Sequence, residues 1–181
     1  MKKLLAAGAA LLFLSACEST SSLPYTNSAQ NVIAAQRALV AADTQISVGQ
    51  FTQAEGVGKP TCRMMGQLDV APGKDISDFI RDAFESEIFA TGRLNADAVS
   101  VRGHVESIEM NTVGTGSWTI SLRISSDSNP EGYSVTARHV FASSYSAYSA
   151  CQNAATAFNP AVQALLNQVV THPQFASLGG N

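Results

Sequence analysis

The sequence predicts an α+β domain: an antiparallel sheet of about four to five strands, with an internal amphipathic helix and a long C-terminal helix packed on one face. Three observations predict this class. Residues 76–91 carry an apolar stripe at helical spacing, residues 98–141 contain three alternating segments, and residues 151–169 keep apolar side chains in helical register. At 181 residues, 45% of them hydrophobic, the chain is long enough for one domain with a substantial core.

The first part of the expected domain combines helix and strand. Residues 28–42 are rich in alanine, which favours a helix. Residues 44–53 alternate apolar and polar side chains and predict a strand. After a glycine-rich loop at 54–61, residues 62–70 predict a second short strand, which ends at the turn formed by residues 71–74.

The helix at 76–91 has the strongest pattern in the chain. Asp75 is expected to cap it, with Asp78 three residues later, and Gly92 is expected to end it. Its apolar stripe consists of Ile76, Phe79, Ile80, Ala83, Phe84 and Ile88. Three acidic residues are expected on the opposite, solvated side of the helix: Asp82, Glu85 and Glu87.

A three-stranded meander is expected next, at residues 98–110, 117–125 and 133–141, because short turn segments separate these alternating stretches. In the first strand the alternation slips near Glu106–Ser107, which predicts a β-bulge. In the C-terminal helical region the register continues across Pro160. Two alternatives stay open there, a second helix that begins at this proline or one kinked helix.

The N-terminus has the three parts of a secretory signal peptide. Lys2 and Lys3 precede an apolar run from Leu4 to Leu14, which is too short for the ~20 residues that a membrane-spanning helix needs. The run ends in Leu14-Ser15-Ala16-Cys17, and these four residues match the bacterial lipobox.

The lipobox resemblance implies cleavage before Cys17, a diacylglycerol thioether on this cysteine, and acylation of the new amino group, for which palmitate is the expected fatty acid. Several acyl chains are needed for stable anchoring, since one chain binds a membrane only marginally. Glu18, in place of the aspartate typical of inner-membrane retention, implies the outer membrane. We expect a signal peptide at 1–16, a lipidated cysteine and flexible polar tether at 17–27, and one periplasmic domain at 28–181.

Once Cys17 carries lipid, two cysteines remain, Cys62 and Cys151. In an oxidising periplasm such a pair predicts a disulfide, and two separate buried thiols are the alternative. Neither cysteine has the CxxC spacing of a redox or zinc site.

No pattern of catalytic, cofactor-binding or metal-binding residues stands out, so we expect a protein that is not an enzyme. His104 and His139 are expected to face different sides of the sheet, which argues against a shared metal. The Gly56–Lys59 segment lacks the full spacing of a phosphate-binding loop. Without Lys2 and Lys3 the chain has 9 basic and 14 acidic residues, a net charge near −5, and such a balance argues against nucleic-acid binding.

The expected order of a strand, a helix, three antiparallel strands and a long helix, together with the lipobox, resembles small envelope lipoproteins of the YajG type. It is also similar to the domain of penicillin-binding-protein activators and to the N-terminal part of TolB. The resemblance implies binding to other envelope components rather than catalysis. We therefore expect a non-catalytic accessory protein that docks an envelope protein, through a sheet edge or through Tyr145 and Tyr148, for which packing at the start of the last helix is the alternative role. The alternative is a carrier of lipid or another apolar ligand in a cleft between sheet and helices, lined by Met64, Met65 and Met110.

Overall fold

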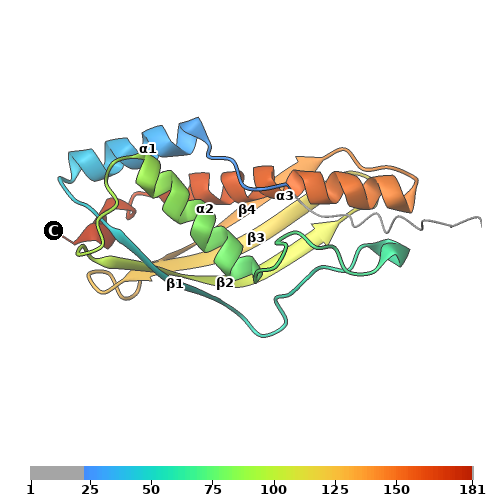
Figure 1. Ribbon diagram of the computed structural model, residues 1–181, viewed down its shortest axis with the longest axis horizontal. Coiled ribbons are helices and arrows are strands. Elements are labelled where there is room, and N and C mark those ends of the chain that lie inside the picture. The colour runs from blue at the N-terminus through green and yellow to red at the C-terminus, as the bar shows by residue number, and fades with distance from the viewer. Residues whose placement is uncertain (1–22, 181) are drawn as a thin grey trace, which may run out of the picture.

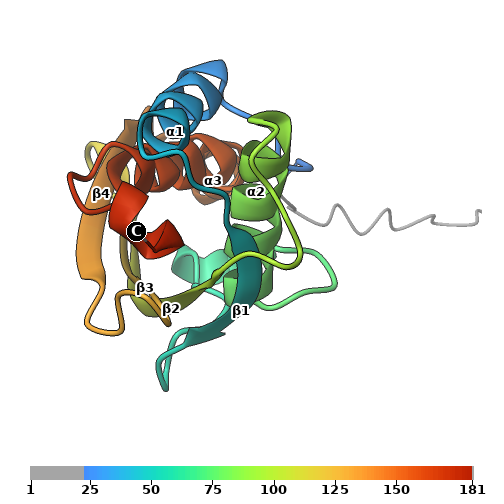
Figure 2. The same ribbon diagram turned by 90° about the vertical axis from the view of Figure 1, so that its left-hand side faces the viewer.

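Four strands form one sheet in the order β1–β2–β3–β4, and all three α-helices lie on one face of it (Figures 1 and 2). The computed structural model describes residues 23–180. The elements are α1 (Ala29–Ala41), β1 (Ser47–Gln53), η1 (Arg63–Met65), α2 (Ile76–Ala90), β2 (Ser100–Asn111), β3 (Gly116–Ser126), β4 (Tyr133–Phe141), α3 (Ala147–Val170) and η2 (Ala176–Gly179). The α+β class is therefore confirmed, with a 24-residue C-terminal helix that packs on the sheet.

The sequence predicts an antiparallel sheet, and this is wrong for one of its strands. β1 pairs with β2 in parallel, with Ser47 beside Ser100 and Gln53 beside Val105. The cause is the connection between them: the chain leaves β1, passes through α2 and returns to the sheet as β2. A crossover of this length, with a helix in it, brings the two strands together in the same direction.

The other three strands form the expected meander. β2 pairs with β3, and β3 with β4, both antiparallel. The predicted bulge is confirmed, because the register between β2 and β3 shifts between Val105 and Ser107. The side chains that face the helices are buried, and the largest of them is Trp118, whose indole Nε1 donates to the carbonyl of Ala154 in α3 at 2.9 Å. This bond fixes the long helix to the centre of the sheet.

The prediction of a strand at residues 62–70 is wrong. The segment forms the short 3-10 helix η1 and irregular chain, and its β-bridge joins Thr61 to Gln67 within the same loop. Cys62, Leu68 and Val70 are nevertheless buried. The apolar residues that suggested a strand thus bury against the core without a sheet neighbour.

In α2 the predicted stripe is buried. The helix ends at Ala90 with Thr91 as its C-cap, and Gly92, which follows, has the positive φ (71°) of a C-terminal stop. The start differs from the prediction. Asp75 occupies the cap position, but its side chain makes no capping bond; the backbone N–H of Ser77 instead donates to Gln53 Oε1 at 3.2 Å. The first turn is therefore fixed to the end of β1.

α3 runs through Pro160 as one helix. A proline inside a helix leaves the carbonyl four residues earlier without its N–H partner. Here that carbonyl belongs to Thr156, and both Thr156 and Pro160 lie on the exposed side of the helix, where water can satisfy it. The opposite side is buried throughout. Across residues 23–180, none of the helices has the length and hydropathy required to cross a membrane.

Candidate functional site

The residues directly before α1 pack against the domain through a buried carboxylate. Glu87 of α2 is fully buried, and its Oε1 accepts three hydrogen bonds: from the Tyr25 hydroxyl at 2.6 Å, from the backbone N–H of Ser28 at 3.0 Å and from Asn31 Nδ2 at 3.2 Å. The expectation that Glu87 lies on a solvated helix face is therefore wrong, whereas Asp82 and Glu85 do form surface ion pairs with Arg81. Glu87 joins α2, α1 and the N-terminal segment.

Burial raises the pKa of Glu87 above its ordinary value of 4.5, and the hydrogen bonds from Tyr25, Ser28 and Asn31 oppose that rise. The second carboxyl oxygen, Oε2, is buried and has no partner among the described residues. Burial also raises the pKa of the Tyr25 hydroxyl, and the neighbouring carboxylate adds to that effect.

This raised pKa predicts a pH dependence of stability. Because folded Glu87 holds its proton to a higher pH than unfolded Glu87, its contribution to the free energy of unfolding should decrease as the pH rises above the ordinary pKa of 4.5. The loss should level off once the pH exceeds the folded-state pKa. Chemical denaturation of the wild type and of Glu87→Gln between pH 4 and 8 measures this contribution as the difference between the two curves. Parallel curves would contradict the assignment.

Two side chains of α3 hold the backbone of the same segment. Asn159 Nδ2 donates to the carbonyls of Leu23 and Pro24, both at 2.8 Å, and Gln163 Nε2 donates to the carbonyl of Thr26 at 2.7 Å. The chain from Thr26 back to Leu23 thus runs along α3 toward the beginning of that helix. Residues 23–27, which were expected to belong to a flexible tether, are packed onto the domain.

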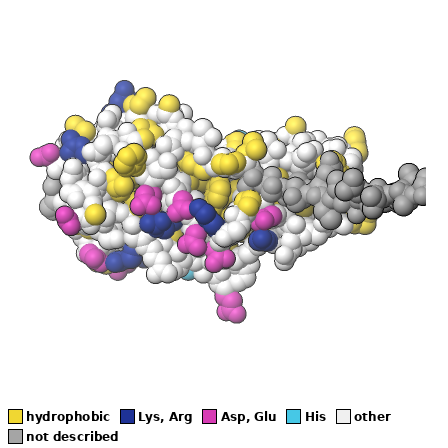
Figure 3. Space-filling view, in the orientation of Figure 1, with side chains coloured by type: hydrophobic (Ala, Val, Ile, Leu, Met, Phe, Trp, Pro, Cys, Tyr) yellow, Lys and Arg dark blue, Asp and Glu magenta, His cyan; other side chains and the backbone are white. Residues whose placement is uncertain are grey.

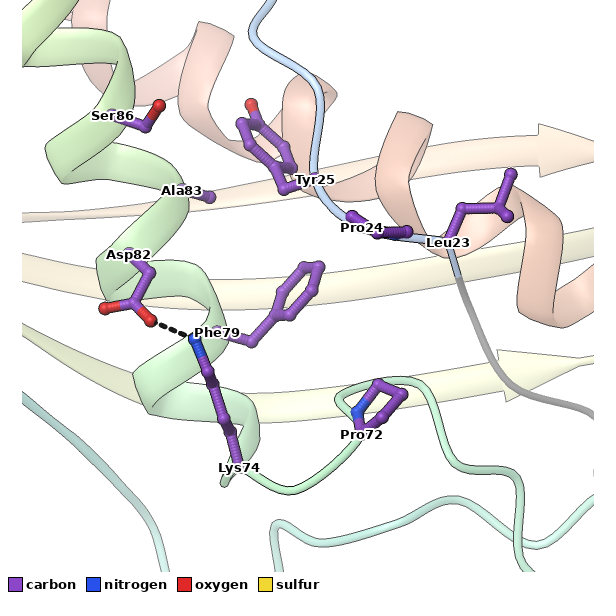
Figure 4. Close-up of a pocket in the computed structure, with 9 residues that line it drawn as sticks. All are labelled: Leu23, Pro24, Tyr25, Pro72, Lys74, Phe79, Asp82, Ala83 and Ser86. Atoms are coloured by element: carbon purple, nitrogen blue, oxygen red, sulfur yellow. Dashed lines mark hydrogen bonds and ion pairs between the residues drawn. The ribbon is translucent and has the colours of Figure 1, made fainter.

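A cavity of about 400 Å³ lies between this segment and α2 (Figure 4). Tyr25 and Pro24 border it on one side, Phe79 and Ala83 of α2 on the other, and Lys74, paired with Asp82, lies at its edge. Its walls are largely apolar and its rim is polar. A cavity of this size and lining suits a small apolar group.

A second feature lies at the end of the molecule where α3 begins. We call it the loop end, and define it as η1 with residues 112–115 between β2 and β3 and residues 143–145 before α3 (right-hand end of Figure 1). The predicted disulfide is confirmed: Cys62 is bonded to Cys151, and the bond fixes η1 to the first turns of α3. Both cysteines are buried.

Arg63 joins the three loops of the loop end. Its guanidinium donates to the side chain and carbonyl of Thr112, to the Ser143 hydroxyl and to the carbonyl of Tyr145. Its backbone has φ of 44°, a region that non-glycine residues rarely adopt. The Arg63 guanidinium is therefore hydrogen-bonded to groups within the loop end.

Apolar side chains project from these loops. Met64 is 95% exposed, Val113 is 71% exposed, Tyr145 is fully exposed, and Met65 is half exposed. A hollow of about 560 Å³ lies between Arg63, Val113 and Tyr145. Figure 3 shows charged side chains gathered over α2 and the left of that face, whereas the visible surface at the right-hand end is white and yellow.

The structure separates the histidines, as expected. His104 lies on the outer face of the sheet, where its Nδ1 is 2.8 Å from the Thr52 hydroxyl, and His139 lies half-buried on the helix side, where burial lowers its pKa. His172 stacks on Tyr133, with ring centroids 3.9 Å apart. Within the described range, 23–180, no group of three His, Cys, Asp or Glu side chains could hold a metal ion.

The methionines, Tyr148 and Lys59, which also stand out in the sequence, lie in different parts of the domain. Met110 is partly buried against the core, whereas Met64 and Met65 are exposed at the loop end. Large side chains, among them Trp118 and Phe158, fill the space between sheet and helices. Tyr148 is half-buried at the start of α3. Lys59, at the end of the glycine-rich loop, pairs with Asp69 at 3.0 Å.

Cys17 and the whole lipobox lie outside the described residues. Sequence reasoning missed the contact of Tyr25 and Asn31 with Glu87 and the role of Arg63. A signal for Glu87 and Asn31 existed: Glu87 is four residues after Ala83 and three after Phe84, and Asn31 is four before Ala35. This spacing puts both polar residues on apolar stripes.

Comparison with known proteins shows similarity to solved structures. No protein-family model matches the chain, and no curated protein matches it. A crystal structure of a Xanthomonas campestris protein, assigned to family DUF330, is similar to it with a TM-score of 0.49 and 17% sequence identity. The similarity covers 71% of this chain and 82% of that protein.

Proposed function

We propose that this protein is a lipoprotein of the cell envelope, anchored to the outer membrane through lipid on Cys17 and facing the periplasm, that docks another envelope protein without catalysing a reaction. The lipobox Leu14–Cys17 and the residue Glu18 support the anchor and the membrane. The disulfide between Cys62 and Cys151 fits an oxidising compartment.

The observation that carries the docking proposal is the difference between the two sheet edges. β1 has a register shift between Val48 and Phe51, and its Gly49 carbonyl accepts a bond from Arg81. β4 instead pairs with β3 in continuous register from Tyr133 to Phe141. In the described part of the chain no strand pairs with the outer side of β4.

Edge strands are usually protected by a bulge, a proline or a lysine, because their open backbone groups can pair with another chain. β4, with the sequence YSVTARHVF, has neither a proline nor a lysine, Arg138 is its one arginine, and its ladder with β3 has no bulge. It is therefore the edge at which an extended segment of a partner would add as a fifth strand.

Photocrosslinking in intact cells of the producing bacterium tests this proposal. A photoreactive phenylalanine analogue placed at Thr136 or Arg138, which are exposed on β4, should give one discrete adduct with an envelope protein. The same analogue at Gln50 or Thr52 of β1 is the matched control and should give none.

A blocking variant completes the test. The double substitution Thr136→Lys and Val140→Lys adds charge beside the β4 edge at two exposed positions, so the domain should still fold. It should reduce the adduct formed from Arg138 by about tenfold, a loss of about 1.4 kcal/mol in binding. Equal adducts from β1 and β4, or an adduct that survives this variant, would contradict docking at β4.

A second candidate function is that of a carrier of lipid or another apolar ligand, and the cavity beside Tyr25 and Phe79 favours it. If the protein is a carrier, lipid should co-purify with it and be detected by native mass spectrometry. Ser86→Trp, which places a large ring at the cavity edge, should then displace that lipid, while Ser134→Trp on the outer face of the sheet should not. Protein that carries no lipid besides its own anchor would exclude this candidate.

A further inference from the structure

The loop end concentrates the exposed apolar surface of the domain. Nine large hydrophobic side chains are exposed among the described residues, and four of them, Met64, Met65, Val113 and Tyr145, belong to the loop end. A gathering of exposed apolar groups at one place indicates an interaction site rather than scattered surface residues.

The loop end contains one charged residue. Residues 112–115, 143–145 and η1 carry small polar or apolar side chains apart from Arg63, and the Arg63 guanidinium is bonded to groups of these same loops. When these loops leave water, the Arg63 guanidinium keeps its hydrogen bonds to neutral groups of the same loops, which lowers the cost of burying it. The disulfide and Arg63 hold the apolar tips in place.

The length of chain outside the described residues limits where the lipid can be. Cys17 is six residues before Leu23, and even a fully extended chain of that length spans only about 20 Å. Leu23 is held beside Asn159, and the segment it ends runs toward the first turn of α3. From Asn159 back to Ala147 the helix is about 18 Å long.

These two lengths are nearly equal. Cys17 can therefore reach the level of the loop end, and little farther. If Cys17 carries lipid in a membrane, Leu23 lies within about 20 Å of that membrane. The loop end, toward which residues 26 to 23 run along α3, is then within reach of the membrane surface.

We infer that the loop end rests on the phospholipid bilayer, with Met64, Val113 and Tyr145 inserted at the level of the lipid headgroups. Tyrosine favours this zone because its ring is apolar and its hydroxyl can stay in water. In this orientation the long axis of α3 and the strands rise from the membrane, and the β4 edge remains accessible to a partner from the side. The inference rests on the lipid anchor of the proposed function.

Spin labelling of the full lipidated protein in vesicles of phosphatidylethanolamine and phosphatidylglycerol tests the inference. Nitroxides are attached at Val113→Cys or Tyr145→Cys in the oxidised protein, and at Glu131→Cys as control, in the exposed turn at the other end of β3. Power saturation then compares access to oxygen with access to a water-soluble nickel chelate. Labels at 113 and 145 should be about fivefold less accessible to nickel than the label at 131.

A further variant separates insertion from simple proximity. Met64→Asp places a charge among the inserted tips and should restore nickel access to the label at 113, because a carboxylate is costly in the bilayer. Equal nickel access at 113, 145 and 131 in protein shown by mass spectrometry to be lipidated would overturn the inference and leave the anchor intact. Protein without lipid on Cys17 would instead overturn the proposed function on which it rests.

Discussion

Replacing both bonded cysteines, Cys62→Ala with Cys151→Ala, is expected to lower the free energy of unfolding by about 4–5 kcal/mol. The disulfide joins residues 89 positions apart, and a cross-link that closes so long a loop strongly reduces the conformational freedom of the unfolded chain. The bond also fixes η1, a segment without a partner strand, to α3. Guanidinium chloride denaturation followed by circular dichroism measures the change.

The reduced wild type is the control for this prediction. It keeps both buried sulfur atoms, so it separates the loss of the cross-link from the loss of packing in the alanine variant. Reductant should destabilise the wild type and leave the double variant unchanged. A loss below about 1 kcal/mol in both cases would contradict the structural importance assigned to the bond.

Glu87→Leu is expected to lower the free energy of unfolding by roughly 3 kcal/mol at neutral pH. The substitution removes the acceptor of three donors: the half-buried Tyr25 and Ser28 lose this partner, and the buried Asn31 amide keeps only its bond to the Gln163 carbonyl. A leucine fills a similar volume, so the loss should come from these polar groups. The segment before α1 should lose its attachment to α2, and thermal or chemical denaturation records the effect.

Glu87→Gln is the matched variant. Its amide oxygen can accept the same three bonds, and it carries no charge into a buried position, so it should be at least as stable as the wild type at pH 8. Equal stability of the leucine and glutamine variants would show that the three hydrogen bonds contribute little.

Periodic patterns made most of the fold predictable. The stripe of α2 predicted its buried side, and the alternation in residues 98–141 predicted β2, β3 and β4 together with the bulge after Val105. The register across Pro160 was compatible with one helix, which the structure contains. These signals are strong because each element buries one face over several turns or residue pairs.

Three features could not be obtained in the same way. The apolar residues around Cys62 resemble a strand, but the segment has no strand to pair with, and its disulfide and Arg63 determine its shape. Tyr25 lies outside every periodic element, so its contact with Glu87 depends on tertiary structure alone. The parallel pairing of β1 with β2 was not predicted, although the predicted helix between the two strands favours such a pairing.

Part of the candidate site was also predictable. Cys62 and Cys151 followed from their number and the expected compartment, and Tyr145 stood out as an aromatic residue before the last helix. The loop end as a surface was not predictable, because three loops distant in sequence form it and only the folded chain brings them together around Arg63.

Mass spectrometry of the mature protein, extracted from membranes of the producing bacterium, tests the central claim most directly. That claim is a domain held at a membrane by lipid on Cys17. Trypsin should release a peptide that begins at Cys17 and ends at Arg37, with the mass of a diacylglyceryl group and one further acyl chain. A Cys17 peptide with an unmodified thiol, or a mature chain that still begins at Met1, would contradict the account.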